Sequence, residues 1–197
     1  MGDVLTNLIN TYHELNANVV DELREEPSPL EFMRYVASNR PFVVRGAASD
    51  WKASQRWSAE YLKKAMGDQR ITVAVTPTGH ADAVVEQDDG TRLFVEPLEV
   101  EEPFSSFLDG IRQTSLNPEA SSQQENVKYA QAQNDCLRNE FPVLYEDVPK
   151  EIPFARIALD KHADAINVWV GSDASVTALH RDNYEVRASI GVQSIDG

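Results

Sequence analysis

An imidazole and a carboxylate stand two residues apart near the end of the sequence, at His180 and Asp182. His180 ends the strand-like run Ser175–His180, and Asp182 comes two residues later. Side chains two residues apart on a strand point to the same side. The pair supplies two of the three ligands of the 2-His-1-carboxylate arrangement, which holds non-haem iron(II) and leaves coordination positions open. The same short pattern also fits a turn with a surface ion pair, so both interpretations stay open at this point.

The elements that would position this pair can be predicted from alternation and turn residues. Ala165–Gly171 has the β-branched and aromatic composition of a strand, and Gly171–Ala174 supplies a turn before Ser175–His180. Val127–Ala130 is an earlier candidate strand. Thr114–Asn126, which is rich in Ser, Gln and Asn, is the best loop candidate in the chain.

Helix signals dominate the N-terminal region. Apolar residues recur at three- and four-residue steps from Val4 to about Leu23, which predicts an amphipathic helix whose apolar face packs on another element. Ser28 is a candidate N-cap, with Pro29 at the first helical position and Glu31 closing a capping box, so a helix should run to about Ser38. The other predicted elements are a strand at Pro41–Gly46, a helix from Ser58 that stops at Gly67, a strand at Arg70–Val75, a hairpin turn at Asp88–Gly90 before a strand at Leu93–Val95, a helix from Pro103 to about Arg112, and a short helical or turn segment at Glu140–Val148.

Composition fits one globular domain and limits the classes of partner. The chain has 197 residues, of which 42% are hydrophobic and 25% charged, and no apolar run reaches the roughly 20 residues that span a bilayer. We therefore expect no membrane partner. A net charge of −14 repels phosphate backbones, so we expect no nucleic acid partner, whereas a cationic protein segment would be attracted. Cys136, the only cysteine, permits no disulfide within the chain, which favours a packed thiol in the cytoplasm or nucleus.

Longer stretches of the sequence resemble the JmjC and cupin-like hydroxylases. The resemblance is specific in Asn167–Gly171 and in Ser175–Glu185, and it extends upstream through Val127–Gln131 and through Arg40–Gly46 with Trp51 and Trp57. Within that family the chain is similar to the small JmjC lysyl hydroxylases, also associated with peptidase activity, that act on developmentally regulated GTP-binding proteins. The resemblance implies an α+β fold, with N-terminal helices and part of a jelly-roll barrel of roughly eight strands (a double-stranded β-helix, cupin-like).

The resemblance also implies cofactors and roles for individual residues. The family motif places the iron(II) ligands at His180 and Asp182, and it places contacts to 2-oxoglutarate at Tyr129 and Thr177. A pair of hydroxyl groups suits the distal carboxylate of this co-substrate, whose keto-acid end chelates the metal. Without the resemblance, Tyr129 would be read as a buried aromatic residue and Thr177 as an ordinary strand residue.

After Glu185 the likeness to the family ends. Ile195 stands where we expect the lysine that neutralises the distal carboxylate, and family members carry a second iron-binding histidine downstream, whereas His13, His80 and His162 all lie upstream. We therefore expect a helical region at residues 1–40, the first part of the JmjC domain at 41–185 and a tail unrelated to the family at 186–197. A retained intron, a frameshift or a faulty gene prediction would explain that tail.

Three functional interpretations follow from these observations. The first is the N-terminal portion of a JmjC lysyl hydroxylase that is inactive as it stands, with a protein substrate that could be a GTP-binding protein. The second is a non-catalytic binding or regulatory fragment, for which exposed strand edges would favour association, including homo-oligomers. The third is a metal-dependent peptidase that uses the same ligands.

Overall fold

The computed structural model describes residues 2–15, 19–116, 126–178 and 180. These residues group into two compact units. One is formed by the described residues of Met1–Ser49 and Glu151–His162, and the other by those of Asp50–Lys150 and Ala163–Gly197. None of the described helices is both long enough and apolar enough to cross a membrane. The predicted boundaries at residues 40 and 185 concern the family resemblance rather than packing, and they stay predictions.

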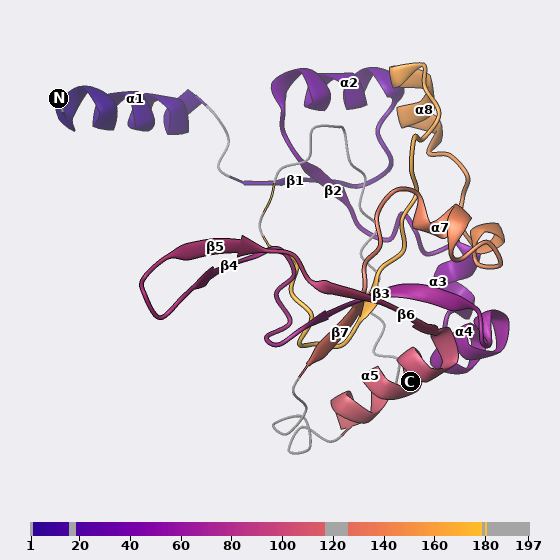
Figure 1. Cartoon of the computed structure of the whole chain (residues 1–197). Coiled ribbons are helices and arrows are strands. Elements are labelled where there is room, and N and C mark those ends of the chain that lie inside the picture. The colour runs from indigo at the N-terminus through magenta and orange to yellow at the C-terminus, as the bar shows by residue number, and fades with distance from the viewer. Residues whose placement is uncertain (1, 16–18, 117–125, 179, 181–197) are drawn as a thin grey trace. The chain divides into compact units, whose positions relative to one another are not determined.

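The first unit combines three helices with one pair of short strands (Figure 1). Its elements are α1 (Gly2–Leu15), β1 (Asp21–Leu23), α2 (Pro29–Ser38), β2 (Phe42–Val44) and α8 (Pro153–Leu159). The capping signals of α2 are confirmed, because the Ser28 side chain accepts a hydrogen bond from the Glu31 backbone N–H while the Glu31 carboxylate accepts one from the Ser28 N–H.

The prediction of a single helix from Val4 to about Leu23 is wrong at its C-terminal end. The helix ends at Leu15, and Asp21–Leu23 forms a strand that pairs in parallel with Phe42–Val44. This pairing uses residues distant in sequence, so helical periodicity could not reveal it. Several apolar side chains of α1 are largely exposed: Val4, Leu5, Leu8 and Ile9.

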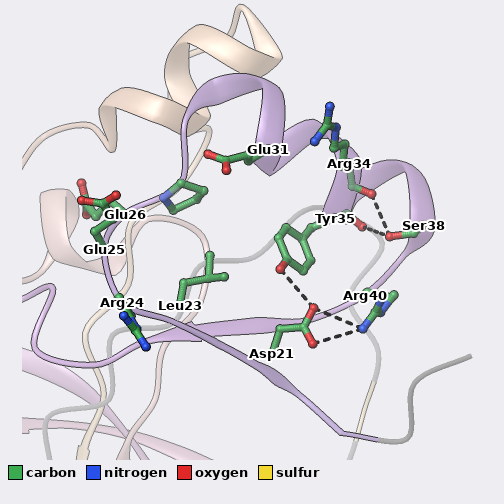
Figure 2. A pocket seen from close by; sticks show the side chains of 11 residues that line it. Asp21, Leu23, Arg24, Glu25, Glu26, Glu31, Arg34, Tyr35, Ser38 and Arg40 are labelled. Atoms are coloured by element: carbon green, nitrogen blue, oxygen red, sulfur yellow. Dashed lines mark hydrogen bonds and ion pairs between the residues drawn. The ribbon is translucent and has the colours of Figure 1, made fainter.

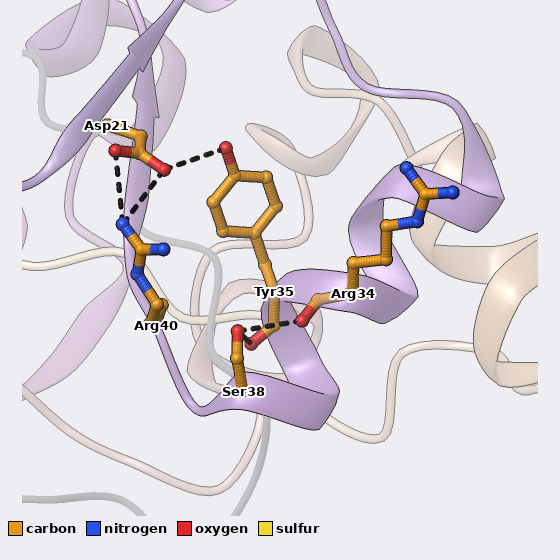
Figure 3. Close-up of polar contacts among 5 residues, drawn as sticks. All are labelled: Asp21, Arg34, Tyr35, Ser38 and Arg40. Atoms are coloured by element: carbon orange, nitrogen blue, oxygen red, sulfur yellow. Dashed lines mark hydrogen bonds and ion pairs between the residues drawn. The ribbon is translucent and has the colours of Figure 1, made fainter. Parts of the chain in front are cut away.

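A polar contact fixes β1 beside α2. The Asp21 carboxylate accepts hydrogen bonds from the Tyr35 hydroxyl at 3.0 Å and from the Arg40 guanidinium at 3.2 Å (Figure 3). The Ser38 hydroxyl donates to the carbonyl of Arg34 within the last turn of the helix. Burial, and then the hydrogen bond to Asp21, raise the pKa of the Tyr35 phenol.

The second unit is organised around an antiparallel four-stranded sheet in the order β6-β3-β7-β8 (Figure 1). The strands span Leu98–Pro103 (β6), Arg70–Thr76 (β3), Val127–Ala130 (β7) and Val170–Gly171 (β8). A separate hairpin, β4 (Ala83–Glu86) with β5 (Arg92–Val95), extends away from the sheet and exposes its apolar side chains. The fold is α+β and cupin-like, and the strands of the described residues do not close a barrel.

One face of this sheet carries the hydrophobic core. The helical elements of the unit are α3 (Lys52–Arg56), α4 (Ala59–Met66), α5 (Phe104–Leu116), α7 (Cys136–Asn139) and the 3₁₀ turn η1 (Tyr145–Asp147). Ile71 and Val73 of β3 belong to one buried cluster with residues of these helices and of the turn after α7, which include Leu62, Met66, Phe104, Phe107, Leu108, Leu137 and Phe141. Burial of these side chains supplies the main driving force for folding of the unit.

Two predicted strands near the end of the described chain are much shorter than expected. Of Ala165–Gly171, only Val170 and Gly171 are in a strand. Two preceding backbone N–H groups bond to side chains instead: the Ile166 N–H donates to Asp135 Oδ1 and the Val168 N–H donates to Cys136 Sγ. Among the described residues of Ser175–His180, an isolated bridge between Val176 and His80 replaces the predicted strand.

Several further elements were not anticipated from the sequence. These are the strand β6 and the helices α3, α7 and α8. Helix α5 continues to Leu116, beyond the predicted end near Arg112 and into the predicted loop. The rest of that loop, residues 117–125, lies outside the described residues.

Candidate functional site

Two hydroxyl groups predicted to share a ligand lie close together. The Tyr129 hydroxyl oxygen and Thr177 Oγ1 are 3.4 Å apart, within hydrogen-bonding distance. Tyr129 occupies the inner strand β7, where it pairs with Ala74 of β3 on one side and with Gly171 of β8 on the other. Because side chains alternate along strands, Tyr129 lies on the sheet face opposite to the buried Ile71 and Val73.

A tight turn holds the segment that carries Thr177. The Val176 N–H donates to the carbonyl of Gly79 at 2.9 Å, and the Gly79 N–H donates to the buried Thr76 hydroxyl at 2.9 Å. Gly79 has a φ of +81°, and a side chain there would overlap the carbonyl of Ala174. The Ser175 hydroxyl donates to the carbonyl of Lys128 on β7. Contacts of Ser175 and Val176, the two residues before Thr177, therefore help to fix its position.

The predicted metal ligand His180 is exposed, and its Nδ1 lies 2.8 Å from the carbonyl oxygen of Ala178. When Nδ1 carries the ring proton, it donates to this carbonyl and the lone pair lies on Nε2. This is the arrangement by which a backbone carbonyl commonly orients a metal-binding imidazole, so the local geometry fits the predicted role. Asp182 lies outside the described residues, so its predicted position beside His180 stays a prediction.

The other histidines that the structure describes in detail are engaged elsewhere. The His80 ring contacts the carbonyl of Thr78 within its turn, and His162 pairs with Glu151 in the other compact unit. In the described part of the chain, no three His, Cys, Asp or Glu side chains form a group that could hold a metal ion.

Lys128 is next to Tyr129 in sequence but serves the opposite face of the sheet. Its ammonium group donates to both carboxylate oxygens of Glu102 at 2.8 Å, and both side chains are partly buried. This ion pair neutralises the lysine on the core side. Lys128 is therefore committed to Glu102 and does not supply positive charge beside the Tyr129 hydroxyl.

The segment just before β8 is held by contacts with Cys136 that were not predicted from the sequence. The Cys136 N–H donates to Asn167 Oδ1 at 3.0 Å, and the Cys136 thiol contacts the carbonyl and the N–H of Val168 at 3.4 Å each. Burial raises the pKa of this thiol, so it packs as a neutral group, as the sequence predicts. The available signal was Asn167 itself, a polar residue inside an otherwise apolar run.

A pocket of about 430 Å³ lies in the first unit, beside β1 and α2 (Figure 2). Charges of both signs line it: Arg24, Arg34 and Arg40 against Asp21, Glu25, Glu26 and Glu31. Asp21 and Arg40 pair with each other there. None of the residues predicted to bind metal or co-substrate lines this pocket, so it is separate from the Tyr129–Thr177 pair.

Most of the chain matches known proteins. The cupin-like domain family matches residues 27–188. The chain is 41% identical over 167 residues to the human bifunctional peptidase and (3S)-lysyl hydroxylase JMJD7, covering 84% of this chain and 49% of that protein. It is 36% identical over 167 residues to JmjC domain-containing protein E of Dictyostelium discoideum, covering 82% of this chain and 46% of that protein.

A plant relative shows the same partial coverage. The chain is 33% identical over 188 residues to the lysine-specific demethylase JMJ32 of Arabidopsis thaliana, covering 94% of this chain and 52% of that protein. The chain thus spans about half the length of these relatives. The family match covers most of the chain and includes the positions of Tyr129, Thr177, His180 and Asp182. The chain therefore belongs to the cupin-like JmjC family.

Proposed function

We propose that the protein is part of an iron(II)- and 2-oxoglutarate-dependent hydroxylase that modifies lysyl side chains of proteins. The observation that carries the proposal is the 3.4 Å approach of the Tyr129 and Thr177 hydroxyls. Thr177 stands three residues before His180 in the chain. Family membership makes this chemistry the natural interpretation of such a pair. The names of two relatives, a lysyl hydroxylase and a lysine-specific demethylase, support lysine as the target.

The hydroxyl pair fits one end of the co-substrate. Two hydroxyls this close can both donate to a single carboxylate, which fixes the distal end of 2-oxoglutarate. The keto-acid end would then be directed toward His180 and Asp182, which we assign as metal ligands. Bound iron(II) would supply the activation of oxygen. The role of the protein in this proposal is to bind and orient, which can contribute a large part of a rate enhancement.

The residues present make the 197-residue chain a poor catalyst by itself. Its sequence offers one histidine in the metal motif, and Ile195 cannot form the charged contact that a lysine would give to the distal carboxylate. We therefore propose weak retention of metal and co-substrate by this chain alone. The net charge of −14 favours a cationic protein substrate, and a GTP-binding protein with an exposed lysine is one candidate.

Two other functions are supported by specific observations. The human relative is named as a peptidase as well as a hydroxylase, which makes metal-dependent hydrolysis the second candidate. The exposed apolar residues of α1, among them Leu5, Leu8 and Ile9, favour an association role as the third. Only hydroxylation consumes 2-oxoglutarate. Peptide cleavage that proceeds without 2-oxoglutarate would therefore distinguish metal-dependent hydrolysis from hydroxylation. Light scattering tests association between copies.

The direct test measures succinate formed from 2-oxoglutarate with iron(II), ascorbate and a lysine-containing protein. The 197-residue chain is compared with a fusion that appends the C-terminal half of the human relative. We expect background turnover from the chain, clear turnover from the fusion, and loss of that turnover in His180→Ala. Turnover by the chain alone that matches the fusion would refute weak retention, and an active His180→Ala fusion would refute the assignment of the metal ligand.

A further inference from the structure

Gly171 lies directly opposite Tyr129 in the β7–β8 pair. Its backbone does not require glycine, because the positive-φ glycines of the described chain are Gly46, Gly67, Gly79 and Gly90. A reason for a glycine at this position must therefore be sought in the space around its Cα.

The space next to the Gly171 Cα is occupied by side chains of Tyr129 and Ser175. A methyl carbon built on Gly171 would lie 2.7 Å from Cδ2 of the Tyr129 ring, and 2.5 Å from Oγ and 2.9 Å from Cβ of Ser175. Contacts this short cannot be accommodated without movement of one of the two neighbours. The tyrosine ring thus lies over the bare Cα of Gly171.

Movement of either neighbour, Tyr129 or Ser175, affects the same pair of hydroxyls. Displacement of the ring moves the Tyr129 hydroxyl itself, while displacement of Ser175 moves the segment that carries Thr177 two residues later. Either movement changes the 3.4 Å separation between the two hydroxyl oxygens.

We propose that Gly171 is a positioning residue, whose missing side chain lets Tyr129 approach Thr177 so that the two hydroxyls bind one carboxylate. This inference rests on the proposed function for its ligand, 2-oxoglutarate, but the placement of Tyr129 can be measured without any ligand. Gly171 acts through Tyr129 and is not itself in contact with the reacting atoms.

The test is Gly171→Ala in the full 197-residue chain, with Gly110→Ala as the matched control. Gly110 lies within α5, and a methyl carbon there meets nothing within 4 Å. Tyrosine rings labelled with ¹³C are followed by NMR, and the signal of Tyr129 is assigned by its loss in Tyr129→Phe. We expect that signal to shift in Gly171→Ala and to stay unchanged in Gly110→Ala.

Titration with 2-oxoglutarate, with zinc(II) as a redox-inert substitute for iron, gives the second readout. We expect Tyr129→Phe and Gly171→Ala each to weaken binding by about tenfold or more, the loss expected for one hydrogen bond to a charged group. The loss in the double variant should be smaller than the sum of the two single losses, because Gly171 acts through the same pair of hydroxyls that Tyr129→Phe disrupts. Additive losses would indicate a merely structural role and would overturn the proposal.

The outcomes separate this inference from the proposed function. If Tyr129→Phe weakens binding and Gly171→Ala binds like the parent chain, the positioning role is refuted while the proposed function stands. If Tyr129→Phe has no effect on binding, the co-substrate assignment fails. Binding too weak to titrate is what weak retention by this chain predicts. In that case the NMR signal of the Tyr129 ring alone tests the positioning role of Gly171. A signal that does not shift in Gly171→Ala would refute this role.

Discussion

The hydroxyl oxygens of Tyr129 and Thr177 lie 3.4 Å apart although 48 residues separate them in sequence. The sheet places Tyr129 on an inner strand, and the turn at Gly79 fixes the segment before Thr177. Because different elements supply the two hydroxyls, their separation depends on how strand β7 and the segment before Thr177 pack together. Such a pair can report both on ligand binding and on the integrity of the fold around it.

Thr177→Val should weaken 2-oxoglutarate binding by about tenfold or more, because valine keeps the shape of threonine but cannot donate to a carboxylate. The measurement is an NMR titration of the chain in the presence of zinc(II). The matched control is Thr78→Val, a change at an exposed threonine in the nearby turn, which should bind like the parent chain. Equal affinities for the two variants would exclude Thr177 from the ligand site.

Asp147 should be a major determinant of stability in the second unit. Its carboxylate is buried and accepts hydrogen bonds from Trp57 Nε1 at 3.1 Å and from the Tyr61 hydroxyl at 2.6 Å, with Arg56 at 3.5 Å. Asp147→Ala leaves these donors without their acceptor and should lower the free energy of unfolding by about 2–4 kcal/mol. Urea denaturation measures the loss.

The control for Asp147 is Asp88→Ala in the exposed β4–β5 turn, which should change the free energy of unfolding by less than about 0.5 kcal/mol. A loss at Asp147 no larger than the loss at Asp88 would show that the buried carboxylate does not hold this part of the fold.

The same contact predicts a dependence of stability on alkaline pH. The hydrogen bond to Asp147, together with burial, raises the pKa of the Tyr61 phenol above its ordinary value of 10.0. The folded state therefore favours the protonated phenol, and this contribution is complete below the unfolded pKa and is lost as pH rises through the folded pKa.

The measurement is the urea midpoint between about pH 9 and pH 11.5 for the parent chain and for Tyr61→Phe. The advantage of the parent chain should shrink as pH rises through this window, because phenylalanine has no phenol to ionise. A difference between the two chains that is constant over the whole window would contradict the raised pKa.

Local signals in the sequence predicted the elements whose formation is local. Ser28, Pro29 and Glu31 mark the start of α2, and Ser58 with Gly67 brackets α4, because capping bonds involve neighbouring residues. The hairpin turn at Asp88–Gly90 was predicted for the same reason, and β4 and β5 flank it.

Features that depend on distant partners could not be predicted in this way. The pairing of β1 with β2, and the side-chain bonds that replace strand pairing at Ile166 and Val168, involve residues far apart in sequence. The proximity of Tyr129 to Thr177 was anticipated only through the family resemblance, since neither residue has a distinctive local pattern. Gly171 could not be recognised as a contact of Tyr129 without the strand register.

The measurement that tests the account most directly is a crystal structure of the chain with manganese(II) and 2-oxoglutarate. We expect the distal carboxylate to lie within hydrogen-bonding distance of both the Tyr129 hydroxyl and Thr177 Oγ1, and His180 and Asp182 to contact the metal side by side. Binding of 2-oxoglutarate away from the hydroxyl pair, or metal bound without His180, would contradict the proposed site.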